Sequence, residues 1–583
     1  MAFDIVIRGG KVFDGSGEDA RSADIGIRDG LIADIGSGLA GKETIDADGA
    51  TVTPGFIDLH THYDGQVSWD EELRPSVNFG VTTAILGNCG VGFAPVHRGD
   101  EDALVRLMEG VEDIPGTALH EGINWGWESF PEYMDAIDRL PHTIDFGVMA
   151  VHDPLRMYVM RERAGCDELA TPDDIQKMHD LVAEAMDAGA AGFSTGRSDV
   201  HRTSDGDWTP SSEASLDELA GIASALKGRQ RGVLQAVSDF NLEREGDHFE
   251  HEFRAMETFA RAGGGRPCSM SLMQRDLAPN QWRKILQETE RLNADGVDFR
   301  VQVAPRAIGV FNGLQCTFHP VLAQPAYLAI RDKSLQERVA IMRDPAFKER
   351  CLADPPMQLS GPGSPVPPIV DRIIGDIDNV AFKLFRLGAE PDYEQSAEQS
   401  LGAEAKREGV PIMDKLYDVC LELDGRQLIY FPIYNYVNFN YDDVHEMLVH
   451  PNAMLGLSDG GAHVGTICDA SFPAYFLAHW TRDRERGRID LARAVQMLTA
   501  DPADYLGLSD RGRIQVGQRA DINIIDYDAL ALEAPGMIQD LPAGGQRLMQ
   551  EARGFMKTLV RGQTVVDRDT VTAARPGRLV RFN

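Results

Sequence analysis

Two histidines separated by one residue are the first feature of this chain that could do chemistry. His60 and His62 end an apolar stretch that follows Pro54 and Gly55. Side chains alternate faces along a β-strand, so both imidazoles point the same way, about 7 Å apart. Imidazoles at this spacing can converge on one divalent cation, whereas the alternative is a pair of core histidines. The pattern predicts part of a metal site at the end of a strand.

An aspartate ends another apolar stretch far along the chain. Asp459 is followed by Gly460 and Gly461, so the alternative is an aspartate that simply begins a glycine turn. A carboxylate at a strand end could bind the same cation as the histidines. It could also accept a proton from water, because a bound metal lowers the pKa of that water. We expect Asp459 to be both a metal ligand and the general base.

Three further residues are candidates for the same site. Cys89 ends a strand pattern, and a thiolate is a good zinc ligand, although a buried structural cysteine is the usual alternative. His463 follows Asp459 closely, and His152 ends the third strand pattern, so both are candidates for substrate binding. His201 lies in a polar stretch, and we expect its side chain to be solvated.

The middle of the chain alternates short apolar stretches with helix-length segments such as residues 172–188. This rhythm is typical of strands and helices in parallel α/β folds. We predict a (β/α)8 TIM-like barrel with the candidate residues at the carboxyl ends of its strands. The predicted strands are residues 55–62, 82–89, 145–152, 192–194, 232–237, 268–273, 298–304 and 453–459.

The two ends of the chain have a different pattern, of short strands separated by Asp-Gly and Gly-Gly turns. We predict that they form one small β-sandwich, with the barrel inserted between its halves. About 150 residues separate the last two barrel strands, which is too long for a simple connection, and we interpret them as a lid or subdomain. The predicted units are residues 1–53 and 511–583 (sandwich), 54–308 (barrel strands 1–7), 309–450 (insertion) and 451–510 (last strand and helix).

Composition limits the partners. The 57 Lys and Arg against 91 Asp and Glu give a net charge of −34, which argues against nucleic acid. No apolar run approaches the roughly 20 residues that span a bilayer, so no membrane association is expected. Seven scattered cysteines without CxxC pairs, and a start that leads directly into a strand pattern, favour the cytoplasm. The oligomeric state stays open, and a homo-oligomer fits equally well.

With these motifs assembled, the chain resembles the amidohydrolase superfamily, and within it the N-acyl-D-amino-acid deacylases (D-aminoacylase-like enzymes). The resemblance rests on His60, His62, Asp459 and the terminal strands, and more specifically on residues 87–90 (GNCG), 192–196 (GFSTG), His152 with Arg156, and 574–578 (ARPGR). It implies a zinc site in which the two histidines and the aspartate share the metal region with Cys89, in place of the carboxylated lysine of other members.

The chain departs from these deacylases at two strands. They place further metal-binding histidines at the ends of strands five and six, but residues 232–239 and 268–274 contain none. We therefore expect one Zn²⁺ and leave a second metal open. Gln235 and Gln274 stand in these segments and could orient substrate or water, although ordinary polar strand ends are the alternative.

The expected reaction is hydrolysis of an N-acyl (D-)amino acid or a related small amide. Metal-activated water would attack, and Asp459 would take its proton and deliver it to the leaving nitrogen. Two alternatives remain. The same metal could serve cyclic amide or lactone hydrolysis or decarboxylation, or the chain could be a degenerate member that binds a ligand without turning it over.

Overall fold

The central strands of the chain are parallel and carry most of its core. The computed structural model describes residues 2–241, 247–361, 363–364 and 366–583. Within them, one six-stranded sheet has the order β17-β13-β12-β11-β10-β9, and one three-stranded sheet has the order β6-β7-β8. The strands are β6 (Phe56–Asp58), β7 (Val81–Leu86), β8 (Asp145–Val148), β9 (Ala150–Val151), β10 (Gly192–Arg197), β11 (Val233–Ser238), β12 (Cys268–Leu272), β13 (Phe299–Val303) and β17 (Ala453–Leu455). The eight predicted strand positions are confirmed.

The two sheets adjoin at both edges, but the described strands do not form one continuous cylinder. β8 and β9 belong to different sheets and are separated by Met149 alone. At the other edge, Thr61 and Gly460 form an isolated parallel bridge. The ladder stops short there because the backbone after β17 turns through positive φ at Leu457 (62°) and Asp459 (48°). The prediction of a single closed barrel therefore differs from the observed pairing.

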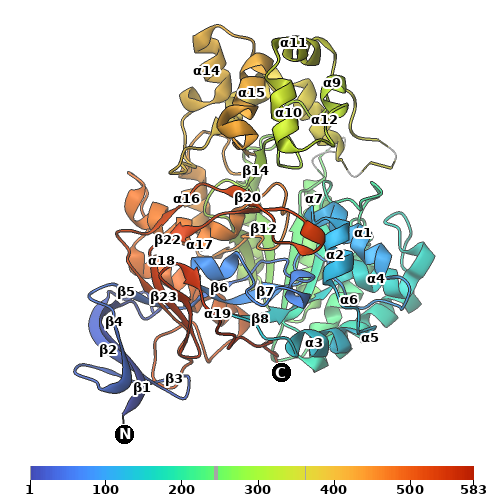
Figure 1. The fold of residues 1–583 in the computed structure, drawn as a ribbon. Helices are drawn as coiled ribbons and strands as arrows, with labels where there is room; N and C mark the ends of the chain where they lie inside the picture. Colours follow the sequence, from blue (N-terminus) through green and yellow to red (C-terminus); the bar gives the residue numbers. More distant parts are fainter. Residues whose placement is uncertain (1, 242–246, 362, 365) are drawn as a thin grey trace.

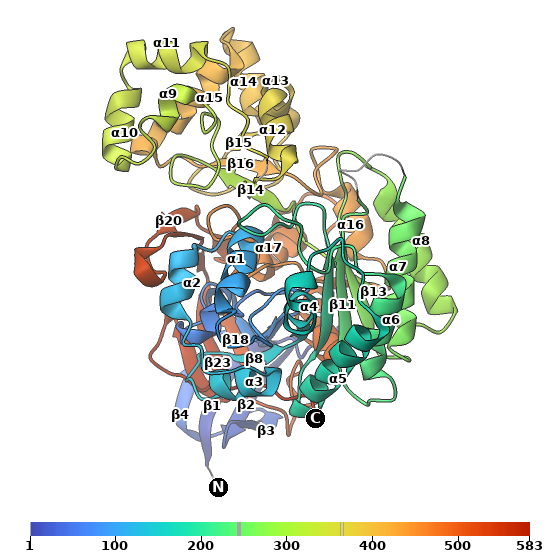
Figure 2. The ribbon, with the colours of Figure 1, turned by 90° about the vertical axis from the view of Figure 1, so that its right-hand side faces the viewer.

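Helices cover the outside of the six-stranded sheet (Figure 2). The predicted helix 172–188 is confirmed as α5 (Pro172–Ala188), which begins with a capping box at Thr171 and ends at the left-handed Gly189. Its apolar stripe, including Met178 and Val182, is buried against the sheet. The other helices of this layer are α6 (Leu216–Ala223), α7 (Phe249–Ala262), α8 (Gln281–Ala294), α18 (Leu491–Leu498) and α19 (Ala500–Leu506).

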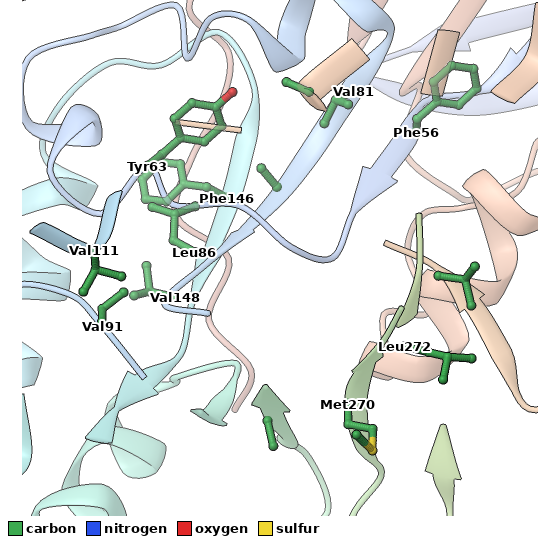
Figure 3. Packing of buried hydrophobic residues seen from close by; sticks show 14 of the residues in the cluster. Phe56, Tyr63, Val81, Leu86, Val91, Val111, Phe146, Val148, Met270 and Leu272 are labelled. Atoms are coloured by element: carbon green, nitrogen blue, oxygen red, sulfur yellow. The ribbon is translucent and has the colours of Figure 1, made fainter. Parts of the chain in front are cut away.

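Helices before and after β8 complete the core on the side of the smaller sheet. They are α1 (Glu101–Glu112), α2 (Gly116–Gly122), α3 (Phe130–Asp138) and α4 (His152–Met160). Val111 of α1 belongs to the same buried cluster as Leu86, Val91 and Val148, and Figure 3 shows these side chains gathered together. This packing fixes the carboxyl end of α1 beside the ends of β7 and β8.

Strands from both ends of the chain share one sheet. Among the described residues it has nine strands, and β5 pairs antiparallel with β18, so the two ends are joined directly. The strands are β1 (Phe3–Val12), β2 (Arg21–Arg28), β3 (Leu31–Gly36), β4 (Gly41–Asp46), β5 (Thr51–Pro54), β18 (Ile522–Ile525), β23 (Phe555–Val560), β24 (Gln563–Asp567) and β25 (Thr570–Val571). That the ends come together is as predicted; their packing as a sandwich stays a prediction.

Residues 309–432, which make up most of the segment between β13 and β17, form a lobe of their own at the top of Figures 1 and 2. It starts at the carboxyl end of β13, so it stands on the side where the parallel strands end. A separate hydrophobic cluster, including Leu314, Tyr327 and Leu416, holds it together. Its elements are β14 (Gly309–Asn312), α9 (Pro325–Leu328), α10 (Leu335–Met342), α11 (Pro345–Ala353), α12 (Pro368–Gly375), α13 (Ile377–Val380), β15 (Phe385–Arg386), α14 (Leu401–Glu408), α15 (Ile412–Cys420) and β16 (Ile429–Pro432). The next helix, α16 (Asp442–Leu448), lies outside the lobe and packs against β13 and β17 as part of the main core.

Among the described residues, no helix combines the length and apolar character needed to cross a lipid bilayer.

Candidate metal centre

Three of the predicted ligands meet at the carboxyl ends of β6 and β7. One ligand atom each from His60, His62 and Cys89 lies within 4.8 Å of the others, and all three residues are buried. Cys89 Sγ lies 3.2 Å from His60 Nε2. Two imidazoles and a thiol gathered in this way form a donor set suited to Zn²⁺.

Asp459 reaches the same point from the loop after β17. Its Oδ1 lies 3.3 Å from His60 Nε2 and 3.7 Å from His62 Nε2. The loop is held there by the backbone N–H of Asp459, which donates to the carbonyl oxygen of His60 at 3.1 Å. The structure therefore brings together all four residues that the sequence analysis assigned to the metal.

The orientation of His60 is set by a side chain behind it. Its Nδ1 lies 2.9 Å from Gln302 Oε1, and Gln302 Nε2 donates to Ser269 Oγ at 2.9 Å. Because Nε2 of Gln302 donates to Ser269, Oε1 of Gln302 faces His60 and accepts the proton of His60 Nδ1. His60 Nε2 is then left as a lone pair directed at the site, as in histidines that ligate metals.

His62 has an acidic neighbour that the sequence analysis missed. Its Nδ1 lies 3.2 Å from Oε1 of Glu112, the last residue of α1. The Glu112 side chain is only 1% exposed, and its Oε2 lies 3.7 Å from His463 Nε2. One signal could have revealed it: Glu112 follows Met108 by four residues and so falls on the apolar face of α1.

Burial favours the uncharged form of each of these groups. It lowers the pKa of His60 to about 4 and raises the pKa of Asp459 to about 7. It also raises the pKa of Cys89 well above its usual value, with the nearby Asp459 adding to the effect. A bound cation would reverse this preference for Cys89 and Asp459 by stabilising the thiolate and the carboxylate, and it would keep the imidazoles neutral. The donor set therefore fits a metal ion, on its chemistry and on the acceptor oxygens that lie beside Nδ1 of each histidine: Gln302 Oε1 for His60 and Glu112 Oε1 for His62.

Cys89 stands in a left-handed turn that a side chain from β11 supports. Its φ is 56°, and its backbone N–H donates to Gln235 Oε1 at 2.9 Å. Gly90 follows at φ 80°, where an added Cβ would lie 2.7 Å from the backbone nitrogen of Gly196. Gln235 Nε2 is buried and has no hydrogen-bond partner among the described residues. The predicted Gln235 is thus at the site, with one free donor.

The other predicted residues have different surroundings. His152 has both ring nitrogens occupied, by Thr195 Oγ1 at 2.9 Å and Glu218 Oε1 at 3.0 Å. His463 is at the site through its contact with Glu112, and its side chain is 25% exposed. His201, which we expected to be solvated, is half-buried. Burial lowers its pKa to about 4, and its charge would lower the pKa of His62 and His463, so it lies near the site.

Gln274 holds the segment that leads into α16, and its hydrogen bonds among the described residues do not involve the proposed metal ligands. Its Nε2 donates to Asp443 Oδ2 at 2.6 Å, and its Oε1 accepts from the backbone N–H of Val437 at 3.3 Å. It therefore joins the end of β12 to the segment that leads into α16.

Comparison with known proteins adds the following. The family model described as "Amidohydrolase family" matches residues 43–363 and 371–566. The D-aminoacylase of Alcaligenes xylosoxydans xylosoxydans is 26% identical over 584 residues, covering 99% of this chain and 97% of that protein. The N-acyl-D-glutamate deacylase of the same organism is 27% identical over 590 residues, covering 99% and 96%. Among solved structures, an N-acyl-D-glutamate deacylase from Bordetella bronchiseptica, complexed with zinc and a phosphonate mimic of the tetrahedral intermediate, matches with a TM-score of 0.65 at 25% identity, covering 100% of each chain.

Proposed function

The chain belongs to the amidohydrolase family, and we propose that it cleaves the amide bond of an N-acyl D-amino acid or a related small amide. The resemblance to the D-aminoacylase group is confirmed by the relatives, which match along nearly the whole chain. It is a metal-dependent hydrolase of carbon–nitrogen bonds outside peptides. The observation that carries the proposal is the convergence of His60, His62, Cys89 and Asp459.

We assign one Zn²⁺ to these four residues. A zinc ion held there would lower the pKa of a water molecule towards neutrality and polarise the scissile carbonyl. The ends of β11 and β12 contribute no histidine, so this chain offers no second set of histidine ligands at those strands.

Asp459 is the general base and then the general acid. Its carboxylate takes a proton from the attacking water, whose oxygen bonds to the carbonyl carbon of the amide. As the carbon–nitrogen bond breaks, Asp459 returns the proton to the nitrogen, so the products are a carboxylic acid and a free amine.

Two neighbours complete the assignment. Gln235 Nε2, buried and without a partner among the described residues, would donate to the carbonyl oxygen as negative charge develops on it. His463, the partly exposed histidine, would contact the substrate. For His152 we favour a supporting role, because Thr195 and Glu218 already engage both of its nitrogens.

We further infer the finer architecture from this function. The two parallel sheets would act as the (β/α)8 barrel, the insertion at 309–450 as a lid over its mouth, and residues 1–53 and 511–583 as a sandwich. All seven cysteines are free, which supports a reducing compartment such as the cytoplasm.

The test is product analysis on purified, zinc-loaded protein. N-acetyl derivatives of D- and L-amino acids are incubated with the wild type and with Asp459→Asn, and products are identified by mass spectrometry. We expect acetate and the free D-amino acid from the wild type and a loss of about 10²–10⁴-fold in rate for the variant. Loss of CO₂, opening only of cyclic amides or lactones, or binding without turnover would instead support one of the alternatives.

A further inference from the structure

We infer that Glu112 is a positioning residue that holds two histidines at once: His62 for the metal and His463 for the substrate. The inference rests on the proposed function, since it assigns roles around the same site. Glu112 reaches the site from a helix, whereas the four proposed ligands all come from strand ends or the loops that follow them.

The two oxygens of Glu112 face different histidines. Oε1 lies 3.2 Å from His62 Nδ1, and Oε2 lies 3.7 Å from His463 Nε2. His62 Nε2 is the nitrogen nearer Asp459, at 3.7 Å, so Glu112 contacts the side of the ring opposite the proposed ion. His62 Nδ1 and Glu112 Oε2 have no hydrogen-bond partner among the described residues, so these contacts are ion-pair distances and not hydrogen bonds. A carboxylate beside Nδ1 favours the tautomer that carries its proton there and leaves the lone pair of Nε2 for a metal ion.

The charge environment of Glu112 supports this role. The side chain is 1% exposed, and the ion-pair partners found among the described residues are His62 and His463, with no lysine or arginine. A buried carboxylate without a cationic partner is costly. When His62 binds a metal ion, the positive charge of the ion extends onto its ring, and this charge compensates the carboxylate of Glu112.

The carboxyl end of α1 is anchored so that Glu112 cannot shift freely. Next to it, Asp113 has a φ of 51°, which ends the helix, and its two carboxylate oxygens accept from Thr317 Oγ1 at 2.8 and 3.0 Å. Thr317 also donates its backbone N–H to the carbonyl oxygen of Gly465 at 3.4 Å. The start of the lobe and the loop that carries His463 are therefore both held by hydrogen bonds at the end of α1.

Zinc affinity, measured by chelator competition on the full chain, tests the metal half of the inference without reference to activity. Glu112→Gln keeps the shape but replaces one acceptor oxygen by a donor and removes the charge. We expect zinc affinity to fall about 10–100-fold. The control Glu121→Gln changes an exposed glutamate on the neighbouring helix α2 and should match the wild type.

The substrate half is tested by kcat/KM with the zinc site saturated. His463→Asn should lower kcat/KM while leaving zinc affinity at the wild-type value. If Glu112 acts through His463, then Glu112→Gln should cost less in the His463→Asn background than alone, because residues that share one partner are not additive.

Three outcomes would overturn the inference: a folded Glu112→Gln chain with wild-type zinc affinity, full additivity of the two substitutions, or an equal zinc loss in Glu121→Gln. Should Glu112→Gln fail to fold by circular dichroism, Glu112→Asp retains the charge at a shorter reach, and wild-type zinc affinity in that variant would equally refute the role. The proposed function fails separately, if the zinc-loaded wild type cleaves no N-acyl amino acid, and the zinc measurements stand whether or not it does.

Discussion

Gln302 Oε1 accepts the Nδ1 proton of His60 at 2.9 Å, and this bond decides which nitrogen of His60 faces the site. The Gln302 amide is itself oriented by Ser269, whose hydroxyl also lies 2.9 Å from Tyr505 OH. A chain of side chains thus runs from β13 and β12 to α19 behind one proposed ligand.

Replacing Gln302, the first of these hydrogen-bonded side chains, should weaken metal binding. Gln302→Leu keeps the volume but removes the acceptor, so we expect a loss of about 10–100-fold in zinc affinity. Tyr505→Phe removes a hydroxyl two steps further from His60 and serves as the control, with a smaller loss expected. Equal affinities for wild type and Gln302→Leu would show that His60 needs no such support.

Cys89→Ser should have a larger effect than either of these changes. Serine is nearly isosteric and keeps the backbone bond to Gln235, but a neutral hydroxyl is a much poorer zinc ligand than a thiolate. Zinc affinity should fall by more than the 10–100-fold expected for an outer partner. Metal analysis after dialysis against a weak chelator measures it, and retention of a full equivalent of zinc would remove Cys89 from the ligand set.

The sequence predicted the strand-borne ligands because their signals are local. His60 and His62 are two residues apart at the end of an apolar stretch, so period-two alternation alone aligns them, and Asp459 similarly ends its own stretch. The place of Glu112 on the apolar face of α1 marks it as buried but does not identify its partner, because His62 lies 50 residues away and only helix packing brings the two together. The electrostatic influence of His201 on His62 likewise depends on the tertiary fold.

The same distinction holds for the fold. Apolar stretches predicted where the parallel strands lie, but not that the described residues join β6 and β17 through the isolated bridge of Thr61 and Gly460 alone. The short pairing depends on the left-handed backbone at Leu457 and Asp459, and leucine rarely adopts this region unless tertiary contacts impose it.

A buried ion pair ties the segment just after β13 to the short helical turn Asp469–Ser471 and should contribute strongly to local stability. Arg306 Nη1 lies 2.8 Å from Asp469 Oδ1, and both side chains are fully buried. Asp469→Asn leaves the guanidinium without its counter-charge, so the free energy of unfolding in urea should fall by about 3–5 kcal/mol. Asp173→Asn breaks the exposed Lys177–Asp173 pair on α5 and should cost far less, because water and salt screen exposed ion pairs. Similar values for the two variants would contradict this ranking.

A glycine allows the loop after β17 to approach the end of α1. A Cβ on Gly465 would lie 2.8 Å from Asp113 Oδ2 and also clash with Thr317 Oγ1. Gly465→Ala should therefore lower the free energy of unfolding by about 1–3 kcal/mol, as overpacking does. Gly165→Ala has open space around its Cβ and is the matched control. An unchanged urea midpoint for Gly465→Ala would mean that the two segments do not pack this closely.

The most direct measurement is a crystal structure of the zinc-loaded protein with anomalous data at the zinc absorption edge. We predict one anomalous peak contacting His60 Nε2, His62 Nε2 and Cys89 Sγ, at about 2.0–2.3 Å. No peak among these atoms, or a zinc ion held by other residues, would contradict the account.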